Sequence, residues 1–157
     1  MKVAHVITRM IIGGAQENTL YNCLDLIRDY GDEVMLITGP AIGPEGDLLR
    51  RHDLTGLRLV EIPTLIRAIH PWKDFASYRA ISKTLAEFQP QVVHTHSAKG
   101  GMLGRMAAWR LKTPCVVHTV HGAPFHAYQP WAARRFFIAC ERYAAARCHH
   151  LVSVADA

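Results

Sequence analysis

The sequence predicts an α/β fold, built on a doubly wound parallel sheet of about six strands with helices on both faces, in three layers. Short apolar runs alternate along the chain with segments whose apolar residues recur at helical spacing. Glycine turns follow two of these runs, at Gly13-Gly14 and at Gly100-Gly101. A third run starts at Cys115 and stops at Gly122, and it reads as a strand buried on both faces. Together these features are typical of a Rossmann-like domain.

The first half of the chain is predicted to hold three strands and two helices. Apolar residues at helical spacing begin after Ala15, and Gly31 ends that helix. A loop dense in turn residues covers 39–46, and a short helix is expected around Asp47–His52. The strands are Lys2–Thr8, Glu33–Thr38 and Leu57–Ile62.

The second half continues the alternation of strands and helices. Strands are predicted at Gln91–Thr95, from Cys115, and at Leu151–Val154. Asp74 is the expected N-cap of a helix, and a second helix starts near the turn at Lys99. The buried stripe of the first helix is Phe75, Tyr78, Ile81, Leu85 and Phe88. The second carries Leu103, Met106, Ala107 and Leu111.

A further helix follows the loop 123–130 and precedes the last strand. Its inward residues are expected to be Phe136, Phe137, Cys140, Tyr143 and Ala144. Ser153 to Ala157 resembles a strand followed by the cap of one more helix, so we expect the chain to continue beyond Ala157 as the first half of a longer protein.

Charge and cysteine content limit the class of protein only loosely. The net charge of +5 and a pI near 9.2 weakly favour an anionic partner. No basic stripe with interleaved aromatic residues is present, so nucleic-acid binding is not expected. The four cysteines lack metal-site spacing and suit reduced thiols in a cytoplasmic protein. No apolar stretch is long enough for a signal peptide or a membrane span.

Two turns are expected to face each other at the switch point of the sheet, between the first and fourth strands. They are the Gly13-Gly14 turn and the turn that contains Ser97, Lys99 and Gly100. Free N–H groups of two helix N-termini would then point at one place and bind phosphate. The glycines fit tight turns equally well, and spacing alone leaves both readings open. A missing third glycine and the absence of an acidic residue after Ile37-Thr38 disfavour a nicotinamide dinucleotide site.

Histidines gather at the predicted carboxyl ends of two strands, and two chemical readings compete. His94 and His96 share a strand face, and His118 or His121 could complete a metal site. No Asp or Glu lies between Glu87 and Glu141, which disfavours both a hydrolytic metal site and a glycosidase. Neutral imidazoles instead suit hydrogen bonds to sugar hydroxyls and to a diphosphate. His121 is expected to face the cleft, while His94 and His118, like His5, fit packed imidazoles.

Aromatic and basic residues open the helix before the last strand. Trp131, Arg134 and Arg135 fit contact with anionic lipid headgroups or an ordinary solvated helix face, and the second reading is favoured.

In their order along the chain, four motifs resemble one family. They are Gly13-Gly14-Ala15-Gln16, Val93-His94-Thr95-His96-Ser97, Lys99-Gly100-Gly101-Met102-Leu103-Gly104-Arg105 and Thr119-Val120-His121-Gly122. The chain is similar to the N-terminal domain of family-4 retaining glycosyltransferases of the group-1 type, which have the GT-B architecture of two Rossmann-like domains. The likeness covers nearly the whole chain and is strongest to members that build cell-surface polysaccharide or lipopolysaccharide.

This resemblance implies transfer of a sugar from a nucleotide-sugar donor to a saccharide or lipid-linked acceptor, with retention and without a metal or other cofactor. His121 would be the catalytic histidine that holds the donor sugar. Substrate contacts would come from Gly13, Gly14, Ser97, Lys99, Gly100 and Gly122. Arg105 would be a structural partner. The donor-binding C-terminal domain is absent, so residues 1–157 would form the acceptor-side domain, inactive alone, in the cytoplasm or peripheral to the inner membrane.

A second hypothesis from another class remains beside this one. The chain would be a freestanding Rossmann-like binding module, or a metal-dependent hydrolase that uses the His94, His96 and His118 cluster. Stoichiometric metal after purification without chelator would favour it.

Overall fold

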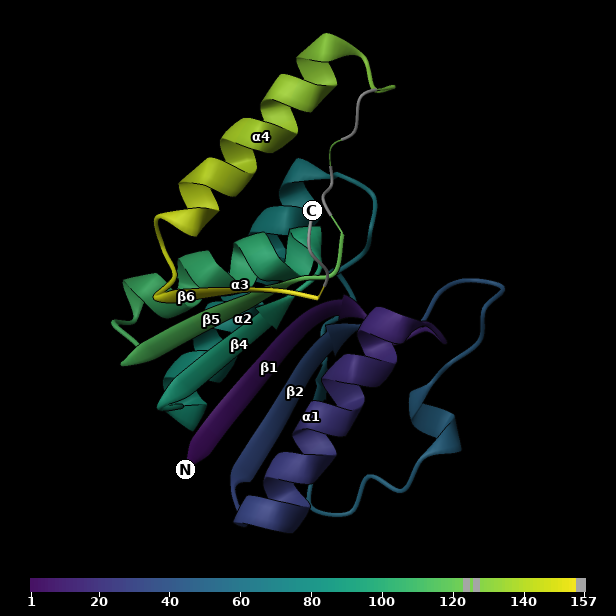
Figure 1. Ribbon diagram of the computed structural model, residues 1–157, viewed down its shortest axis with the longest axis vertical. Coiled ribbons are helices and arrows are strands. Elements are labelled where there is room, and N and C mark those ends of the chain that lie inside the picture. The colour runs from purple at the N-terminus through teal and green to yellow at the C-terminus, as the bar shows by residue number, and fades with distance from the viewer. Residues whose placement is uncertain (123–124, 126–127, 155–157) are drawn as a thin grey trace.

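Six parallel strands form one sheet in the order β3-β2-β1-β4-β5-β6, in a computed structural model that describes residues 1–122, 125 and 128–154 (Figure 1). The predicted doubly wound, Rossmann-like class is therefore confirmed. The strands are β1 (Lys2–Arg9), β2 (Glu33–Gly39), β3 (Arg58–Glu61), β4 (Val92–His96), β5 (Cys115–Val120) and β6 (His150–Ser153). The helices are α1 (Gly14–Tyr30), α2 (Pro71–Phe88), α3 (Ala98–Arg110) and α4 (Trp131–Ala145).

The helices cover the two faces of the sheet unequally. On one face α1 packs over β1 and β2, with Leu20 and Leu24 against Ile7 and Leu36. On the other face α2 and α3 pack over the sheet, and their apolar side chains meet those of β1, β2, β4 and β5. Side chains alternate along each strand, so every second residue of β1 faces α1. This alternation decides on which face each histidine lies.

The order of the strands places the switch point between β1 and β4. The chain leaves β1 through α1 toward β2, whereas α3 carries it from β4 toward β5 on the other face. The carboxyl ends of β1, β4 and β5 therefore lie next to one another at one edge of the sheet. In doubly wound sheets this edge is where ligands bind.

The first helix ends as the sequence predicts, and the second begins earlier than predicted. Gly31 has the left-handed φ of 65° and donates its N–H to the carbonyl of Ile27, which closes α1. The predicted N-cap Asp74 is wrong, because α2 begins at Pro71 and its N-cap is His70. Pro71 suits the first helical position, since its φ is preset and its missing N–H needs no partner there. The carboxylate of Asp74 accepts a hydrogen bond from the backbone N–H of His70.

The short helix expected around Asp47–His52 is present as a single turn of 3-10 helix, Leu49–Arg51. The expected apolar stripes are too broad, because Phe75 of α2 is exposed and α4 has Ala144 as its one fully buried residue. Phe136 and Tyr143 are exposed in α4, since that helix leans on α3 over a short contact and does not lie flat on the sheet.

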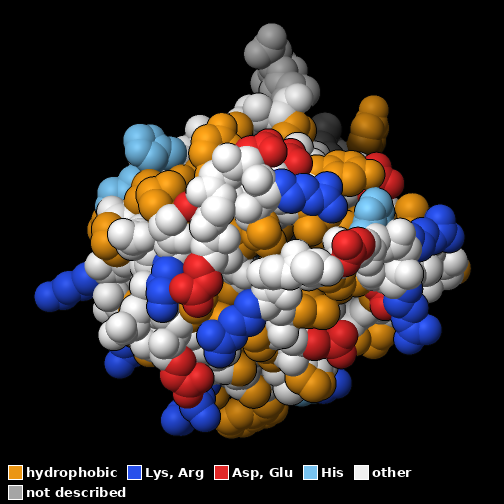
Figure 2. Space-filling model, turned by 90° about the horizontal axis from the view of Figure 1, so that it is seen from below, with side chains coloured by type: hydrophobic (Ala, Val, Ile, Leu, Met, Phe, Trp, Pro, Cys, Tyr) orange, Lys and Arg blue, Asp and Glu red, His pale blue; other side chains and the backbone are white. Residues whose placement is uncertain are grey.

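The face at the amino ends of the strands carries charges of both signs. Figure 2 shows the molecule from below the view of Figure 1, and basic and acidic side chains alternate there with apolar groups. Lys2 and Glu33, for example, form an ion pair of 3.5 Å at the start of β1 and β2. The net positive charge of the chain is therefore not gathered into one basic patch on this face. The predicted loop 123–130 and the end of the chain fall partly on residues outside those described.

Candidate functional site

A hydrogen-bonded turn joins the carboxyl end of β1 to the start of α3. Ser97 connects β4 to α3 with the left-handed φ of 59°, which turns the chain sharply into the helix. Its Oγ atom lies 2.7 Å from Oγ1 of Thr8 and also accepts the backbone N–H of Thr8 at 3.2 Å. Oγ1 of Thr8 in turn accepts the N–H of Gly100 at 2.9 Å. Ser97 therefore reaches the predicted edge of the sheet, held by the strand beside it.

Gly100 lets α3 approach β1 closely. A Cβ atom at this position would lie 2.7 Å from the backbone N of Thr8 and 2.8 Å from the carbonyl carbon of Ile7, too close for any side chain. Its N–H is bonded to Thr8, so it is not free to bind phosphate. Of the two readings that the sequence left open, the tight packing of a turn is the one that Gly100 serves.

The glycines before α1 are not packed against a strand in the way that Gly100 is packed against β1. Gly13 is the extended N-cap of α1, and its carbonyl accepts the N–H groups of Gln16 and Glu17. Gly14 is exposed, and a Cβ atom there would meet nothing within 4 Å. Gly14 and Ala15 are the first two residues of α1, where N–H groups have no acceptor within the helix and carry the positive end of its dipole. Phosphate binding at Gly13-Gly14 stays a prediction.

A cavity of about 610 Å³ opens beside the Ser97 turn. Its walls come from the end of β1, the first turn of α1, the segment before α2, the start of α3, and α4. Ser97 and Lys99 line it, together with Arg9, Gln16, Arg67 and Glu141. The sequence pattern does not assign Arg9, the last residue of β1, or Arg67, in the segment before α2, to this cavity, because neither belongs to a motif with a fixed spacing. With Lys99 they give the lining three cations against two carboxylates, Asp74 and Glu141, which leaves a small excess of positive charge. Arg9 also donates to the carbonyl oxygen of Ile42 and lies 4.0 Å from a carboxylate oxygen of Glu45.

Lys99 is engaged by the segment before α2. Its Nζ atom lies 2.6 Å from Oδ1 of Asp74, and it also donates to the carbonyl oxygen of Ala68. Both charged side chains are largely buried, so the pair is held in place. Lys99 therefore braces α2 against the start of α3, and its expected contact with substrate stays a prediction.

Arg105 joins α3 to α4 from a fully buried position. Its Nη2 atom donates to Oε2 of Glu141 at 2.9 Å, and its Nε atom donates to the carbonyl oxygen of Gly101 at the same distance. These contacts confirm the expectation that Arg105 is a structural partner. Glu141 also lines the cavity, so the pair fixes one wall of the site to its floor.

The histidines divide between the two faces of the sheet. His5 and His94 are paired in register, and His96 lies on the same face of β4, toward α1. His121 follows β5 in phase with Thr119, which is paired with His96, and so belongs to this face. His118 is paired with Thr95 and lies on the other face against Gly101. The cluster of His94, His96 and His118 is therefore wrong, because the alternation of side chains separates His118 from the other two.

On the α1 face the imidazoles are hydrogen-bonded in a line. Nδ1 of His5 lies 3.1 Å from Nε2 of His96, and Nδ1 of His96 lies 3.1 Å from Nε2 of His121. His94 stands beside this line and places its Nε2 atom 2.7 Å from Oγ1 of Thr119. His5 and His96 are fully buried, whereas His121 is half-buried. His121 is thus the member of the line that a ligand can reach.

Burial keeps these imidazoles neutral at pH 7. Removal from water, with a smaller contribution from nearby imidazoles, lowers the pKa of His5 to about 3 and that of His94 to about 4. The pKa of His96 is lowered in the same way, and desolvation also lowers that of His121. On the other face burial, helped by the charge of Arg105, lowers the pKa of His118 to about 3. A neutral imidazole offers one N–H donor and one lone pair.

A metal ion is the competing occupant of this group. One ligand atom each from His5, His94 and His96 lies within 4.8 Å of the others. The ring centroids of His5 and His96 are 5.4 Å apart, which equals their N···N distance plus one ring radius at each end. The two nitrogens therefore point straight at each other, as in a hydrogen bond, and not toward a shared third point. Geometry favours hydrogen bonding over metal ligation.

Gly122 completes the edge of the site. It follows His121, is exposed, and would accept a Cβ atom with nothing within 4 Å. Gly13, Gly14, Ser97, Gly122 and His121 thus all lie at the carboxyl edge of the sheet. Of these five residues, Ser97 lines the cavity of about 610 Å³, and the other four do not. Their convergence on one hollow stays a prediction.

Comparison with known proteins points to one family. The family described as "Glycosyl transferase 4-like domain" matches residues 14–157. The chain is also 38% identical over 125 residues to an Escherichia coli protein named UDP-Gal:alpha-D-GlcNAc-diphosphoundecaprenol alpha-1,3-galactosyltransferase. This match covers 80% of the chain and 31% of the relative. The chain therefore spans about a third of the length of this relative.

Solved structures share the fold at low sequence identity. MurG of Acinetobacter baumannii superposes with a TM-score of 0.66 at 13% identity, over 99% of this chain and 41% of that one. The UDP-GlcNAc 2-epimerase of Methanocaldococcus jannaschii superposes with a TM-score of 0.61 at 15% identity, over 98% and 39%. These likenesses establish the Rossmann-like fold alone.

Proposed function

The chain belongs to the glycosyl transferase 4-like domain family, and we propose that it is the acceptor-side domain of an enzyme that moves a sugar from a nucleotide diphosphate to a lipid-linked acceptor, with retention of configuration. The observation that carries this proposal is the placement of the Gly13-Gly14 turn, the Ser97 turn and His121 at one edge of the sheet, where Ser97 lines a cavity that also has two arginines. This edge offers hydrogen-bond donors and positive charge. The two carboxylates that line the cavity, Asp74 and Glu141, are ion-paired with Lys99 and Arg105, which disfavours their use in hydrolysis.

His121 would contact the donor sugar in this mechanism. Its imidazole is half-buried and neutral, so it can donate a hydrogen bond to a sugar hydroxyl or a phosphate oxygen. Gly13 and Gly14 would lie against the diphosphate, where the absence of a side chain allows the backbone of α1 to approach. A departing diphosphate gains negative charge in the transition state, and such donors stabilise that charge.

The acceptor would enter the cavity bordered by α3 and α4. The Escherichia coli relative acts, by its name, on a sugar linked by a diphosphate to undecaprenol. Arg9 and Arg67 on the cavity wall suit the diphosphate of such an acceptor, and exposed Phe136 suits its lipid. This supports a role in the synthesis of cell-surface polysaccharide or lipopolysaccharide. Neither a metal nor another cofactor is part of the proposal.

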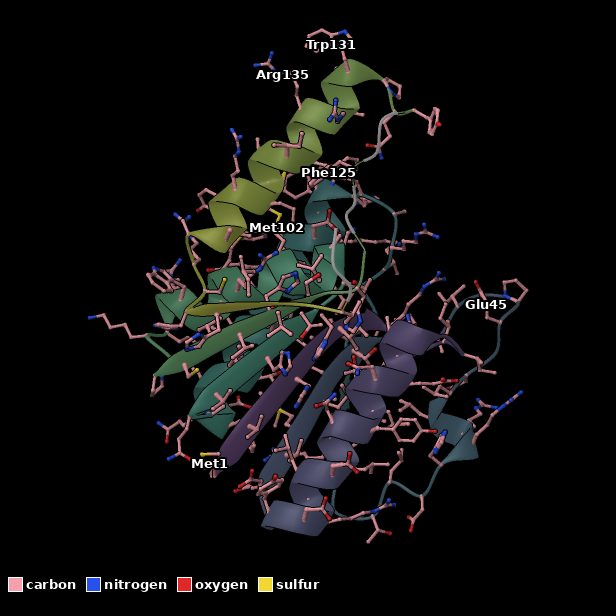
Figure 3. All side chains as sticks on the ribbon, viewed as in Figure 1. Met1, Glu45, Met102, Phe125, Trp131 and Arg135 are labelled. Atoms are coloured by element: carbon pink, nitrogen blue, oxygen red, sulfur yellow. The ribbon has the colours of Figure 1, made fainter. Side chains whose placement is uncertain are left out.

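The outer end of α4 would touch the membrane surface. Trp131 and Arg135 lie at the end of α4 that is far from the sheet (Figure 3), and Trp131 is 74% exposed. A guanidinium beside an exposed indole suits the headgroup layer of an anionic bilayer. No helix in the described part of the chain has the length and hydropathy of a membrane span. Contact would therefore be peripheral, on the cytoplasmic side of the inner membrane.

A chimera tests the proposed function. The segment of the Escherichia coli relative that matches this chain is replaced by residues 1–157, and transfer of galactose from UDP-galactose to GlcNAc-diphosphoundecaprenol is measured. We expect transfer by the chimera and none by residues 1–157 alone, which lack the donor-binding partner. Transfer by residues 1–157 alone would contradict the division of labour between the two domains.

The chimera also tests the role of His121. His121→Ala should lower kcat by about a hundredfold or more, the usual cost of one transition-state donor. His52→Ala is the matched control, because His52 follows the 3-10 turn and its ring meets that of Tyr21 edge to face, away from the site. An unchanged rate in His121→Ala would remove this imidazole from the mechanism.

A further inference from the structure

The hydrogen bonds that link His5, His96 and His121 can donate from His121 toward His5 or from His5 toward His121. This direction fixes which ring nitrogen of His121 carries its proton. His96 makes a hydrogen bond through each of its ring nitrogens, at 3.1 Å to His5 and at 3.1 Å to His121. A neutral imidazole has one N–H and one lone pair, so His96 donates at one side and accepts at the other. Only two arrangements of protons satisfy both bonds.

The buried end of the line decides between these arrangements. Nε2 of His5 is buried and has no hydrogen-bond partner among the described residues. If each imidazole donated inward, toward His5, then Nε2 of His5 would carry an N–H group with no acceptor. If each imidazole donates outward, toward His121, then Nε2 of His5 carries a lone pair. Buried N–H groups without a partner are the rarer and costlier case. The outward arrangement is therefore the stable one.

The geometry supports both contacts as hydrogen bonds, and the direction of donation follows from the buried Nε2 of His5. The ring centroids of His96 and His121 are 5.3 Å apart, close to the greatest separation that their N···N distance allows, so the bond is nearly straight. The planes of His5 and His96 differ by 10°, so each lone pair lies in the plane of the partner ring. Burial also keeps both inner imidazoles neutral, since it lowers the pKa of each.

We propose that His96 is a positioning residue, which donates its Nδ1–H to Nε2 of His121 and so fixes His121 as the Nδ1–H tautomer. This proposal rests on the proposed function of His121 for its catalytic meaning. Nδ1 of His121 then carries an N–H group that can donate to a ligand, and the lone pair of its Nε2 atom accepts the hydrogen bond from His96. His121 would bind an acceptor atom, such as a hydroxyl or phosphate oxygen, and would not act as a general base. His5 sets the direction from below, because its buried Nε2 tolerates a lone pair and not a proton.

The tautomer of His121 is measured by NMR in the absence of any substrate. In the ¹⁵N-labelled chain, a two-bond ¹H–¹⁵N spectrum at pH 7.5 distinguishes a protonated from an unprotonated ring nitrogen. We expect Nδ1 of His121 to be protonated and Nε2 to be unprotonated. Free histidine favours the opposite tautomer in water, so the expected result needs the protein. A protonated Nε2 in the wild-type chain overturns the proposal without any variant.

Two variants at position 96 separate positioning from packing. His96→Asn places an amide nitrogen where Nδ1 stands and should keep the His121 tautomer. His96→Leu fills the space without a donor, and His121 should return to the Nε2–H form. The amide spectrum reports whether each variant folds. If His96→Leu folds and His121 keeps its Nδ1 proton, His96 does not set the tautomer.

Activity in the chimera provides the second measurement. His96→Leu should lower kcat about 10-fold or more, in the range known for outer-shell partners of functional histidines, while KM changes little. His96→Asn should restore most of the rate. A tautomer as proposed together with an active His121→Ala chimera would overturn the proposed function and leave the positioning intact. The opposite tautomer with an inactive His121→Ala chimera would overturn the positioning alone. Stoichiometric metal on His5 and His96 would replace their hydrogen bond and also overturn it.

Discussion

The ammonium group of Lys99 lies 2.6 Å from the carboxylate of Asp74, and this pair joins the first turn of α3 to the first turn of α2. Lys99 belongs to a motif that the sequence assigns to substrate binding, and the structure gives it a partner within the fold. The two roles make different predictions for the isolated chain. A brace contributes to stability without ligand, whereas a substrate contact does not.

Lys99→Met tests the brace. The change leaves a largely buried carboxylate without its partner, so we expect the free energy of unfolding to fall by about 1–3 kcal/mol in urea titrations. Asp74→Leu in addition should restore part of the loss. The control is Lys83→Met, which breaks the exposed pair with Glu87 and should cost about 0.5 kcal/mol or less. Equal stability of Lys99→Met and the wild type would assign Lys99 to the ligand.

Glycine to alanine changes at the two turns should have opposite effects on stability. Gly100→Ala forces a methyl group against the backbone of β1, so we expect a loss of about 1–3 kcal/mol and a lower Tm. Gly14→Ala meets open space at the start of α1 and should leave the Tm unchanged or slightly higher. In the chimera Gly14→Ala should nevertheless reduce transfer, because the methyl group occupies the place proposed for the diphosphate. Full activity of Gly14→Ala would move the diphosphate elsewhere.

The buried pair of Arg105 and Glu141 should respond unequally to the loss of either partner. Glu141→Gln leaves a guanidinium in the core without its counter-charge, and we expect a cost of about 3–5 kcal/mol. Arg105→Met leaves a carboxylate that is 22% exposed and can reach water, so its cost should be smaller. Thermal unfolding of both variants measures the difference. Equal costs would show that α4 moves to hydrate Arg105.

Mild acid should destabilise the chain steeply. His5, His94 and His118 have folded pKa values of about 3 to 4, below the unfolded value of 6.5. Above pH 6.5 these histidines are neutral in both the folded and the unfolded chain, so their burial costs no stability through protonation. As the pH falls from 6.5 toward 4, these histidines are protonated in the unfolded chain and stay neutral in the folded one. The free energy of unfolding therefore falls by about 1.4 kcal/mol per pH unit for each histidine. Urea titrations between pH 7.5 and 5 measure this slope. A flat profile would contradict neutral burial.

Charge reversal on α4 tests the proposed membrane contact. Arg134→Glu with Arg135→Glu should weaken binding to phosphatidylglycerol vesicles by about 1 kcal/mol for each residue, as judged by co-sedimentation. Arg50→Glu with Arg51→Glu makes the same change of charge at the 3-10 turn and is the matched control. If both double variants lose binding equally, net charge alone draws the chain to the vesicles.

The spacing of apolar residues along the chain is enough to predict the fold, but it predicts the site only in part. Buried runs and glycine turns are local signals, so the strands were placed to within about a residue and the convergence at one edge followed from topology. The position of His118 required the pairing of Thr95 with His118, which depends on register between strands far apart in sequence. Alternation within a strand alone could place His94 with His96 but could not place His118.

Contacts made by long side chains escaped prediction for a different reason. Lys99 finds Asp74, and Arg9 and Arg67 reach the cavity, only after loops without a repeating pattern have been placed. The inward stripe of α4 was overestimated because an apolar spacing shows which residues can be buried and not how much of the helix has a surface to meet. Phe136 satisfies the spacing and still lies exposed.

The loose seating of α4 has a consequence for how a domain of this kind changes over time. The helix has one fully buried residue, Ala144, and its ion pair to α3 joins Glu141 to Arg105, whereas Thr8, Ser97 and Gly100 are packed and hydrogen-bonded together at the strand ends. Substitutions in the first half of α4 therefore reshape a wall of the cavity at little cost in folding free energy. Selection for a different acceptor can act on this helix while the machinery at the strand ends is inherited unchanged.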